Sequence, residues 1–67
     1  MNEAIAKVSK ALDEGKPFIE AYRAAGEGVI ENLQGAAIVA KIEQSNARGK
    51  AFAEWWRGPK FVQDYLN

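Results

Sequence analysis

The side chains that most often carry out chemistry are scarce in this chain. Histidine and cysteine are both absent, which removes the commonest general base, the thiolate nucleophile and the usual nitrogen and sulfur ligands of transition metals. The two serines, Ser9 and Ser45, have no histidine to activate them as nucleophiles. We therefore expect no catalytic residue, no metal site and no cofactor-binding residue, and we predict that the protein is not an enzyme.

Carboxylates are the remaining acid–base groups. Asp13 and Glu14 are adjacent, but neighbouring residues of a helix point in different directions, so the pair is typical of solvated charges. Glu20, Glu27 and Glu31 recur at helical spacing, and we interpret them as the exposed face of a helix. Neither pattern indicates acid–base catalysis.

The length of the chain limits how much stability its own core supplies. At 67 residues, the sequence holds one small domain, spanning positions 1–67. A chain of roughly 60 residues buries only about 60% of its unfolded surface, and small scaffolds usually add disulfides, a metal or a partner. Without cysteine or histidine, good packing or association is left as the source of additional stability.

Charge and hydropathy bear on partners and location. Residues 1–33 carry a net charge of −2 and residues 34–67 a net charge of +2, an asymmetry too mild to indicate a polyanionic partner. The longest strongly apolar run, GAAIVA at 35–40, is far shorter than the roughly 20 residues of a membrane-spanning helix. No secretory signal is visible. We expect a cytoplasmic protein, and packaging into a particle stays open.

Two short helices are predicted at the N-terminus. Asn2 can cap the first, whose apolar stripe ends before the left-handed stop expected at Gly15. Pro17 suits the first turn of the second helix, where its missing N–H costs nothing. Gly26 then weakens the helix by about 1 kcal/mol relative to alanine, so we expect it to end near Ala25.

The segment from Val29 to about Arg57 has the apolar periodicity of one long helix. Unbroken, it would extend for roughly 43 Å, too far for the two short helices to cover. The stretch EQSNARGK is polar nearly all round, which leaves open a break near 45–49, but we favour a continuous helix. Small residues along it allow close helix packing. They are Gly35, Ala36, Ala40 and Gly49.

The C-terminal part holds most of the aromatic residues. Gly58 and Pro59 end the long helix, because proline cannot continue it. A short C-terminal helix is expected next, with Phe61 and Tyr65 on one face. The predicted fold is all-α, with three to four helices: two short N-terminal helices, one long central helix and one short C-terminal helix.

These features favour a function by protein–protein association, as a homo-oligomer or as part of a larger assembly such as a phage particle or a helical filament. A helix that is apolar on two faces needs neighbours on both sides, and aromatic residues are enriched in interface hot spots. Trp55 and Trp56 point about 100° apart on a helix, so one packs internally and the other is left for a partner. The predicted interface consists of Ile38, Ile42, Phe52, Trp55, Trp56, Phe61 and Tyr65.

DNA binding is the second hypothesis for this sequence. The segment ALDEGKPFIEAYRAAGEGVIENL resembles a helix–turn–helix, which implies a small regulator or adaptor with a recognition helix beginning at Val29. That helix lacks basic residues in its first two turns, where phosphate contacts are needed. A small group of basic residues lies further on, and we interpret it as an exposed, solubilising surface. It consists of Arg48, Lys50, Arg57 and Lys60.

The length and composition are equally compatible with a small inhibitor that docks on one host enzyme. Binding to a membrane surface through the tryptophans is a weaker hypothesis, because Glu54 and Asp64 lie among the aromatic residues and disfavour anionic lipid.

Overall fold

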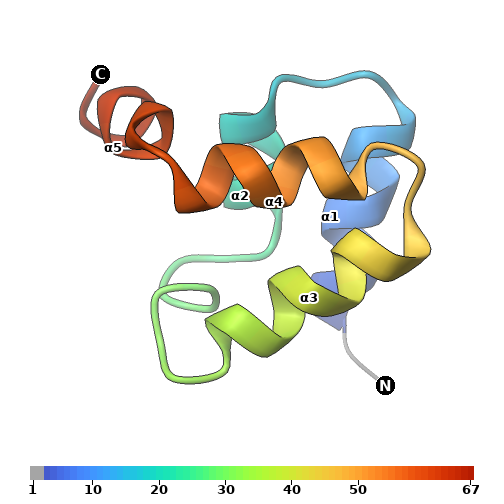
Figure 1. The fold of residues 1–67 in the computed structure, drawn as a ribbon. Coiled ribbons are helices and arrows are strands. Elements are labelled where there is room, and N and C mark those ends of the chain that lie inside the picture. The colour runs from blue at the N-terminus through green and yellow to red at the C-terminus, as the bar shows by residue number, and fades with distance from the viewer. Residues whose placement is uncertain (1–2) are drawn as a thin grey trace.

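The computed structural model describes residues 3–67, and over that range the chain is all-helical, with no strand (Figure 1). This confirms the predicted all-α class, although residues 3–67 form five helices rather than three or four. None of the helices in the described range is long and apolar enough to cross a membrane. The helices are α1 (Glu3–Asp13), α2 (Phe18–Ala24), α3 (Gly35–Ser45), α4 (Gly49–Arg57) and α5 (Pro59–Leu66).

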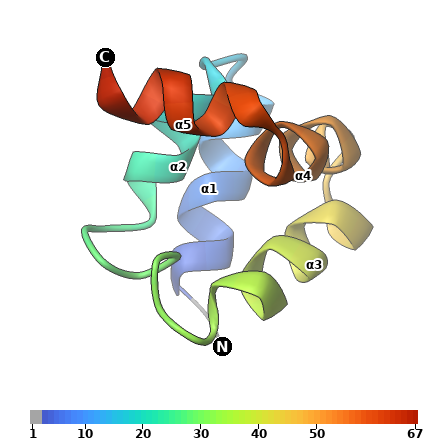
Figure 2. The same cartoon turned by 60° about the vertical axis from the view of Figure 1, so that its left-hand side comes forward.

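Glycine ends the first helix, as its position in the sequence predicts. Gly15 has the left-handed φ of 79°. Its N–H donates to the carbonyl of Leu12 at 3.0 Å, and the N–H of Lys16 donates to the carbonyl of Ala11 at 3.1 Å, which together form a Schellman motif. The chain then reverses so that α2 packs along α1 (Figure 2). The predicted cap, Asn2, lies outside the described residues.

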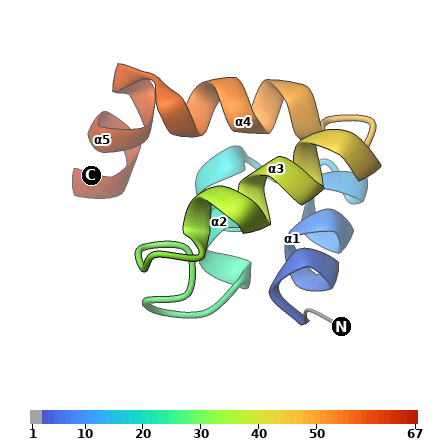
Figure 3. The same ribbon diagram turned by 60° about the horizontal axis from the view of Figure 1, so that its bottom comes forward.

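The central segment is two helices, so the prediction of a continuous helix from Val29 to Arg57 is wrong. Residues 29–34 form turns before α3, and residues 46–48 form the turn between α3 and α4. An unbroken helix of roughly 43 Å would exceed the largest dimension of the molecule, which is 30 Å. Instead α3 and α4 form a helical hairpin, packed side by side (Figure 3).

Each of the two helices in this hairpin begins at the glycine of an Asn-x-x-Gly sequence. The Oδ1 atom of Asn32 accepts a hydrogen bond from the backbone N–H of Gln34 at 2.7 Å. The Oδ1 atom of Asn46 accepts one from the backbone N–H of Arg48 at 2.8 Å. Asparagine side chains that bond the backbone two residues on form turns in competition with helix, which explains why helical periodicity alone misses both breaks.

Glycine is required at the first residue of α3 and of α4. A Cβ atom on Gly35 would lie 1.8 Å from the carbonyl oxygen of Ile30, and one on Gly49 would lie 2.0 Å from the carbonyl oxygen of Ile42. No side chain fits at either distance. The close approach expected at these glycines is therefore made to the preceding backbone of the same chain and not to a neighbouring helix.

The α3–α4 turn is tied to the C-terminal end of α1. The Nη1 atom of Arg48 donates to the carbonyl of Leu12 at 2.8 Å and to that of Lys16 at 3.3 Å, and its guanidinium lies 5.0 Å from the ring centroid of Phe18. Carbonyl groups at a helix C-terminus lack intrahelical partners and attract cations. Asn46 adds a hydrogen bond to the backbone of α1 at 3.2 Å.

The hydrophobic core lies between the first four helices. α1 packs on both α2 and α3, and α3 packs on α4. α5 buries none of its residues fully and rests on α4 and α2. The largest fully buried side chains are Phe52, Leu12, Ile42, Val8 and Val39.

Candidate protein-interaction site

Aromatic side chains pack α5 against α2 and α4. The ring centroid of Tyr22, in α2, lies 4.9 Å from that of Phe61 and 6.1 Å from that of Tyr65. Trp55, in α4, lies 5.3 Å from Phe61, and its Nε1–H donates to the Oδ2 atom of Asp64 at 2.8 Å. Aromatic pairs contribute about 0.5–1.5 kcal/mol each beyond their buried area. This cluster therefore holds α5 over α2.

The two tryptophans differ in how they are packed. Trp55 lies inside the aromatic cluster, 5.8 Å from Phe18 and 5.5 Å from Phe52. Trp56 has a single ring contact within residues 3–67, at 6.5 Å from Phe61, and its indole N–H has no hydrogen-bond partner in that range. Both tryptophans are half-buried against the core, but Trp56 makes fewer aromatic contacts than Trp55.

An apolar hollow of 480 Å³ opens beside Trp56. Its walls come from α2, α3, α4, α5 and the segment between α2 and α3. Leu33, on that segment, is fully exposed to solvent. Glu31 and Asn32 complete the lining. The apolar and aromatic residues that line this apolar hollow are Tyr22, Ile30, Leu33, Ala36, Trp56 and Phe61.

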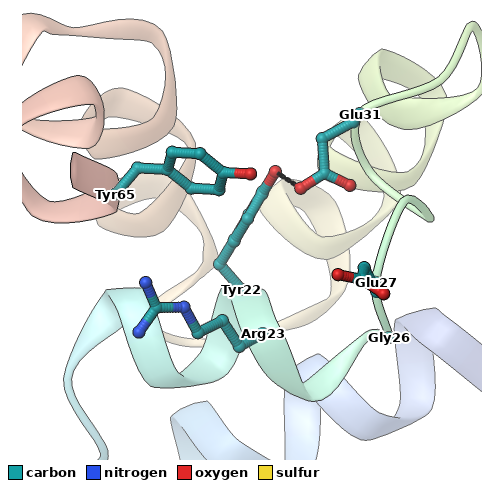
Figure 4. Close-up of a pocket in the computed structure, with 6 residues that line it drawn as sticks. All are labelled: Tyr22, Arg23, Gly26, Glu27, Glu31 and Tyr65. Carbon is teal, nitrogen blue, oxygen red and sulfur yellow. Dashed lines mark hydrogen bonds between the residues drawn. The ribbon is translucent and has the colours of Figure 1, made fainter.

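A second hollow, of 420 Å³, shares Tyr22 and Glu31 with the first (Figure 4). It carries both signs of charge, with Arg23 and Tyr65 on one side of Tyr22 and the two glutamates on the other. We call it the charged hollow, and we call the two hollows together the α5 groove. The charged hollow is lined by Tyr22, Arg23, Gly26, Glu27, Glu31 and Tyr65.

Tyr22 forms the shared wall of the two hollows. Its hydroxyl donates a hydrogen bond to the Oε2 atom of Glu31. Burial raises the pKa of Tyr22 well above its usual range, and the hydrogen bond to Glu31 and the negative charge of Glu31 raise the pKa further. The phenol therefore stays protonated and acts as a hydrogen-bond donor, not as a base.

Arg23 and Glu27 are the free charges of the groove. Both side chains are exposed, and neither forms an ion pair or hydrogen bond with the part of the chain that the structure describes. No three acidic side chains within residues 3–67 are grouped so that they could hold a metal ion. The arrangement offers an apolar hollow, a neutral phenol, one positive charge at Arg23 and two negative charges at Glu27 and Glu31, which are groups suited to noncovalent binding.

Three of the predicted interface residues lie in the core of the folded chain. Ile38, Ile42 and Phe52 are buried in the core, so a partner that docks on the folded chain does not reach them. The break at residues 46–48 is the physical reason, because it folds α4 back on α3 and brings all three side chains into one core cluster.

The remaining predicted interface residues gather at the groove. Trp56 and Phe61 line the apolar hollow and Tyr65 lines the charged one, whereas Trp55 packs inside the cluster. Two residues expected in close helix packing lie elsewhere: Ala36 is exposed and lines the apolar hollow, and Ala40 is half-buried.

Sequence reasoning misses the opposite wall of the groove. The predicted long helix includes Leu33 and Glu31, but both lie in the segment between α2 and α3. Gly28, with a φ of 79°, and the Asn-x-x-Gly turn at Asn32 are the signals for that segment.

Comparisons of the chain with protein-family models, with curated proteins and with solved structures find no match. Its function therefore has to be inferred from the geometry of the groove.

Proposed function

We propose that the protein is a non-enzymatic helical subunit that works by protein–protein association with further copies of itself, and that the α5 groove is its contact surface. Leu33 is the observation that carries the proposal: a fully exposed leucine lines a hollow together with Trp56 and Phe61. Burial of apolar surface stabilises a complex by about 25 cal/mol for each Å² removed from water. Folding of a single chain leaves this surface exposed to solvent.

The composition of the groove supports this proposal. Interface cores are enriched in aromatic residues, and tryptophan and tyrosine are the commonest hot spots. Trp56 and Tyr65 supply both kinds. Clustered exposed apolar surface on a small protein marks an interaction site.

DNA binding is less well supported than association. The helix expected to begin at Val29, which would serve as the recognition helix, begins at Gly35. Two members of the basic group are occupied within the chain: Arg48 donates to the carbonyl of Leu12 in α1, and Arg57 pairs with Glu43 at 3.2 Å. Binding to the phosphate backbone depends on basic side chains that are free to reach it.

The molecular mass in solution tests the proposal. We expect light scattering to give a mass above the 7.4 kDa of one chain, rising with concentration over about 10 to 500 µM, which covers moderate to weak self-association. Trp56→Ala should raise the dissociation constant about 30-fold, as a typical hot spot does, with circular dichroism reporting that the helices are retained. A wild-type protein that stays at 7.4 kDa throughout would overturn the proposal.

A parallel measurement addresses DNA binding. Mixed-sequence duplex DNA is added at low salt, where nonspecific electrostatic binding is strongest. We expect the mass distribution of the protein to be unchanged by the DNA. A salt-sensitive complex would favour the regulator instead.

A further inference from the structure

We infer, on the basis of the proposed self-association, that the α5 groove is a two-fold contact surface. Leu33 of each copy enters the apolar hollow of its partner, and Arg23 of each copy faces the partner's Glu27. The inference goes beyond association as such, because it specifies the symmetry of the dimer and the residues that meet.

The groove is complementary to itself in shape. A two-fold interface uses the same patch on both copies, so that patch has to contain both a projection and a hole that receives it. Leu33 is the projection, since its side chain is fully exposed. The hole is the 480 Å³ hollow beside it, lined by Trp56 and Phe61 among others. Its volume lies within the range of about 300–1,000 Å³ that holds whole small ligands, so a leucine side chain fits.

The groove is also complementary to itself in charge. Figure 4 shows Arg23 and Glu27 on opposite sides of Tyr22, and neither has an ionic partner within the described chain. A two-fold axis that lies in the contact plane between Arg23 and Glu27, perpendicular to the line joining them, places each of these charges opposite the other charge of the second copy. The ion pair therefore forms twice. Complementary charges of this kind orient an interface and suppress wrong partners.

The groove carries both positive and negative side chains, which disfavours binding partners of a single charge sign. A strongly basic segment would meet Arg23, and a strongly acidic one would meet Glu27 and Glu31. A surface that carries both signs of charge around an apolar centre fits best, and the groove of a second copy is such a surface. The chain has a net charge of zero, so no overall repulsion opposes contact between two copies.

Two leucine substitutions form the matched test. Leu33 and Leu66 are both highly exposed, at 102% and 76%, but Leu66 does not line either hollow. We expect Leu33→Ser to raise the dissociation constant of the dimer about 30-fold or more, and Leu66→Ser to change it less than about 3-fold. Both substitutions are on the surface, so thermal melts at low concentration should match the wild type.

A charge exchange tests the ion pair independently. Arg23→Glu alone and Glu27→Arg alone should each weaken the dimer about 5-fold, because each places like charges opposite one another. The double variant, Arg23→Glu with Glu27→Arg, should return the dissociation constant to within about 2-fold of the wild type. Sedimentation equilibrium measures all three variants.

The outcomes separate the inference from the proposed function. A wild type that oligomerises but is insensitive to Leu33→Ser, or equally sensitive to Leu66→Ser, overturns the groove dimer and leaves self-association standing. A double charge variant weaker than either single variant overturns the two-fold arrangement. A wild type that stays monomeric overturns both.

Discussion

The hydroxyl of Tyr22 donates a hydrogen bond to the carboxylate of Glu31 and thereby joins α2 to the segment that carries Leu33 (Figure 4). The same tyrosine ring packs against Phe61 and Tyr65 of α5. One buried side chain therefore contacts both walls of the α5 groove and lines both of its hollows.

Removal of the Tyr22 hydroxyl should destabilise the protein modestly. We expect Tyr22→Phe to lower the free energy of unfolding by about 1–2 kcal/mol, because a hydrogen bond to a charged group is lost while exposed Glu31 regains water. Tyr65→Phe is the matched control, since the hydroxyl of Tyr65 has no hydrogen-bond partner in the described range. Urea unfolding measures both variants, and equal costs would contradict a structural role for the Tyr22–Glu31 bond.

The raised pKa of Tyr22 predicts a loss of stability in alkali. The folded pKa lies above the unfolded value of 10.0, so the stabilisation is fully present below that pH. It is lost as the pH rises from there towards the folded pKa, because the unfolded state releases the proton first. The contribution of Tyr22 to the free energy of unfolding falls by up to about 1.4 kcal/mol for each pH unit.

The Tyr22→Phe variant is the control for this pH dependence. Urea unfolding of the wild type and the variant between pH 8 and about pH 11.5 isolates the Tyr22 contribution from that of the lysines. The wild type should lose stability more steeply than the variant. Parallel pH profiles would show that Tyr22 ionises equally easily in both states.

The tight approach at Gly49 makes it intolerant of any side chain. We expect Gly49→Ala to lower the free energy of unfolding by about 2–3 kcal/mol, as overpacking does, because the new Cβ would lie 2.0 Å from the carbonyl oxygen of Ile42. Gly15→Ala should cost only about 1 kcal/mol, the strain of a left-handed backbone, since nothing lies within 4 Å of its Cβ position. Tryptophan fluorescence follows both unfolding transitions, and a Gly49 variant as stable as the wild type would refute the close approach.

Arg48 should matter to folding rather than to any partner. We expect Arg48→Ala to lower the free energy of unfolding by about 1.5–3 kcal/mol, because it leaves the carbonyl groups at the end of α1 without their charged donor. Lys50→Ala, an exposed change with no ion pair among residues 3–67, should stay within about 0.5 kcal/mol of the wild type. Guanidinium or urea midpoints compare the two. If the two substitutions lowered the free energy of unfolding equally, the hydrogen bonds of Arg48 would not stabilise the fold.

Local chemistry makes several elements predictable from the sequence. The stop at Gly15, the early end of α2 and the start of α5 at Pro59 all follow from backbone restrictions of glycine and proline, which act whatever the surroundings. The absence of alternating apolar residues likewise points to an all-α fold, and the described residues contain no strand.

The central segment is predicted as one helix but forms two. The sequence there favours both a helix and a turn. Apolar periodicity runs through Asn32 and Asn46, whereas both side chains bond the backbone two residues on and favour a turn. Apolar periodicity alone does not show whether a continuous helix or a turn is more stable at these two asparagines. The turns prevail because the α3–α4 hairpin buries Ile42 and Phe52 fully, which a straight helix of a chain this short would leave uncovered.

The sequence by itself determined the helical class, the helix ends at glycine and proline and the concentration of aromatic residues near the C-terminus, because these depend on the chain's local conformational limits and composition. Only the tertiary structure decided that Trp55 packs inside while Trp56 lines a hollow, and that Leu33 lies in solvent beside it. The reason is that a side chain's exposure depends on which elements fold back over it, and here α5 and the segment between α2 and α3 meet at Tyr22 through contacts between residues far apart in the chain.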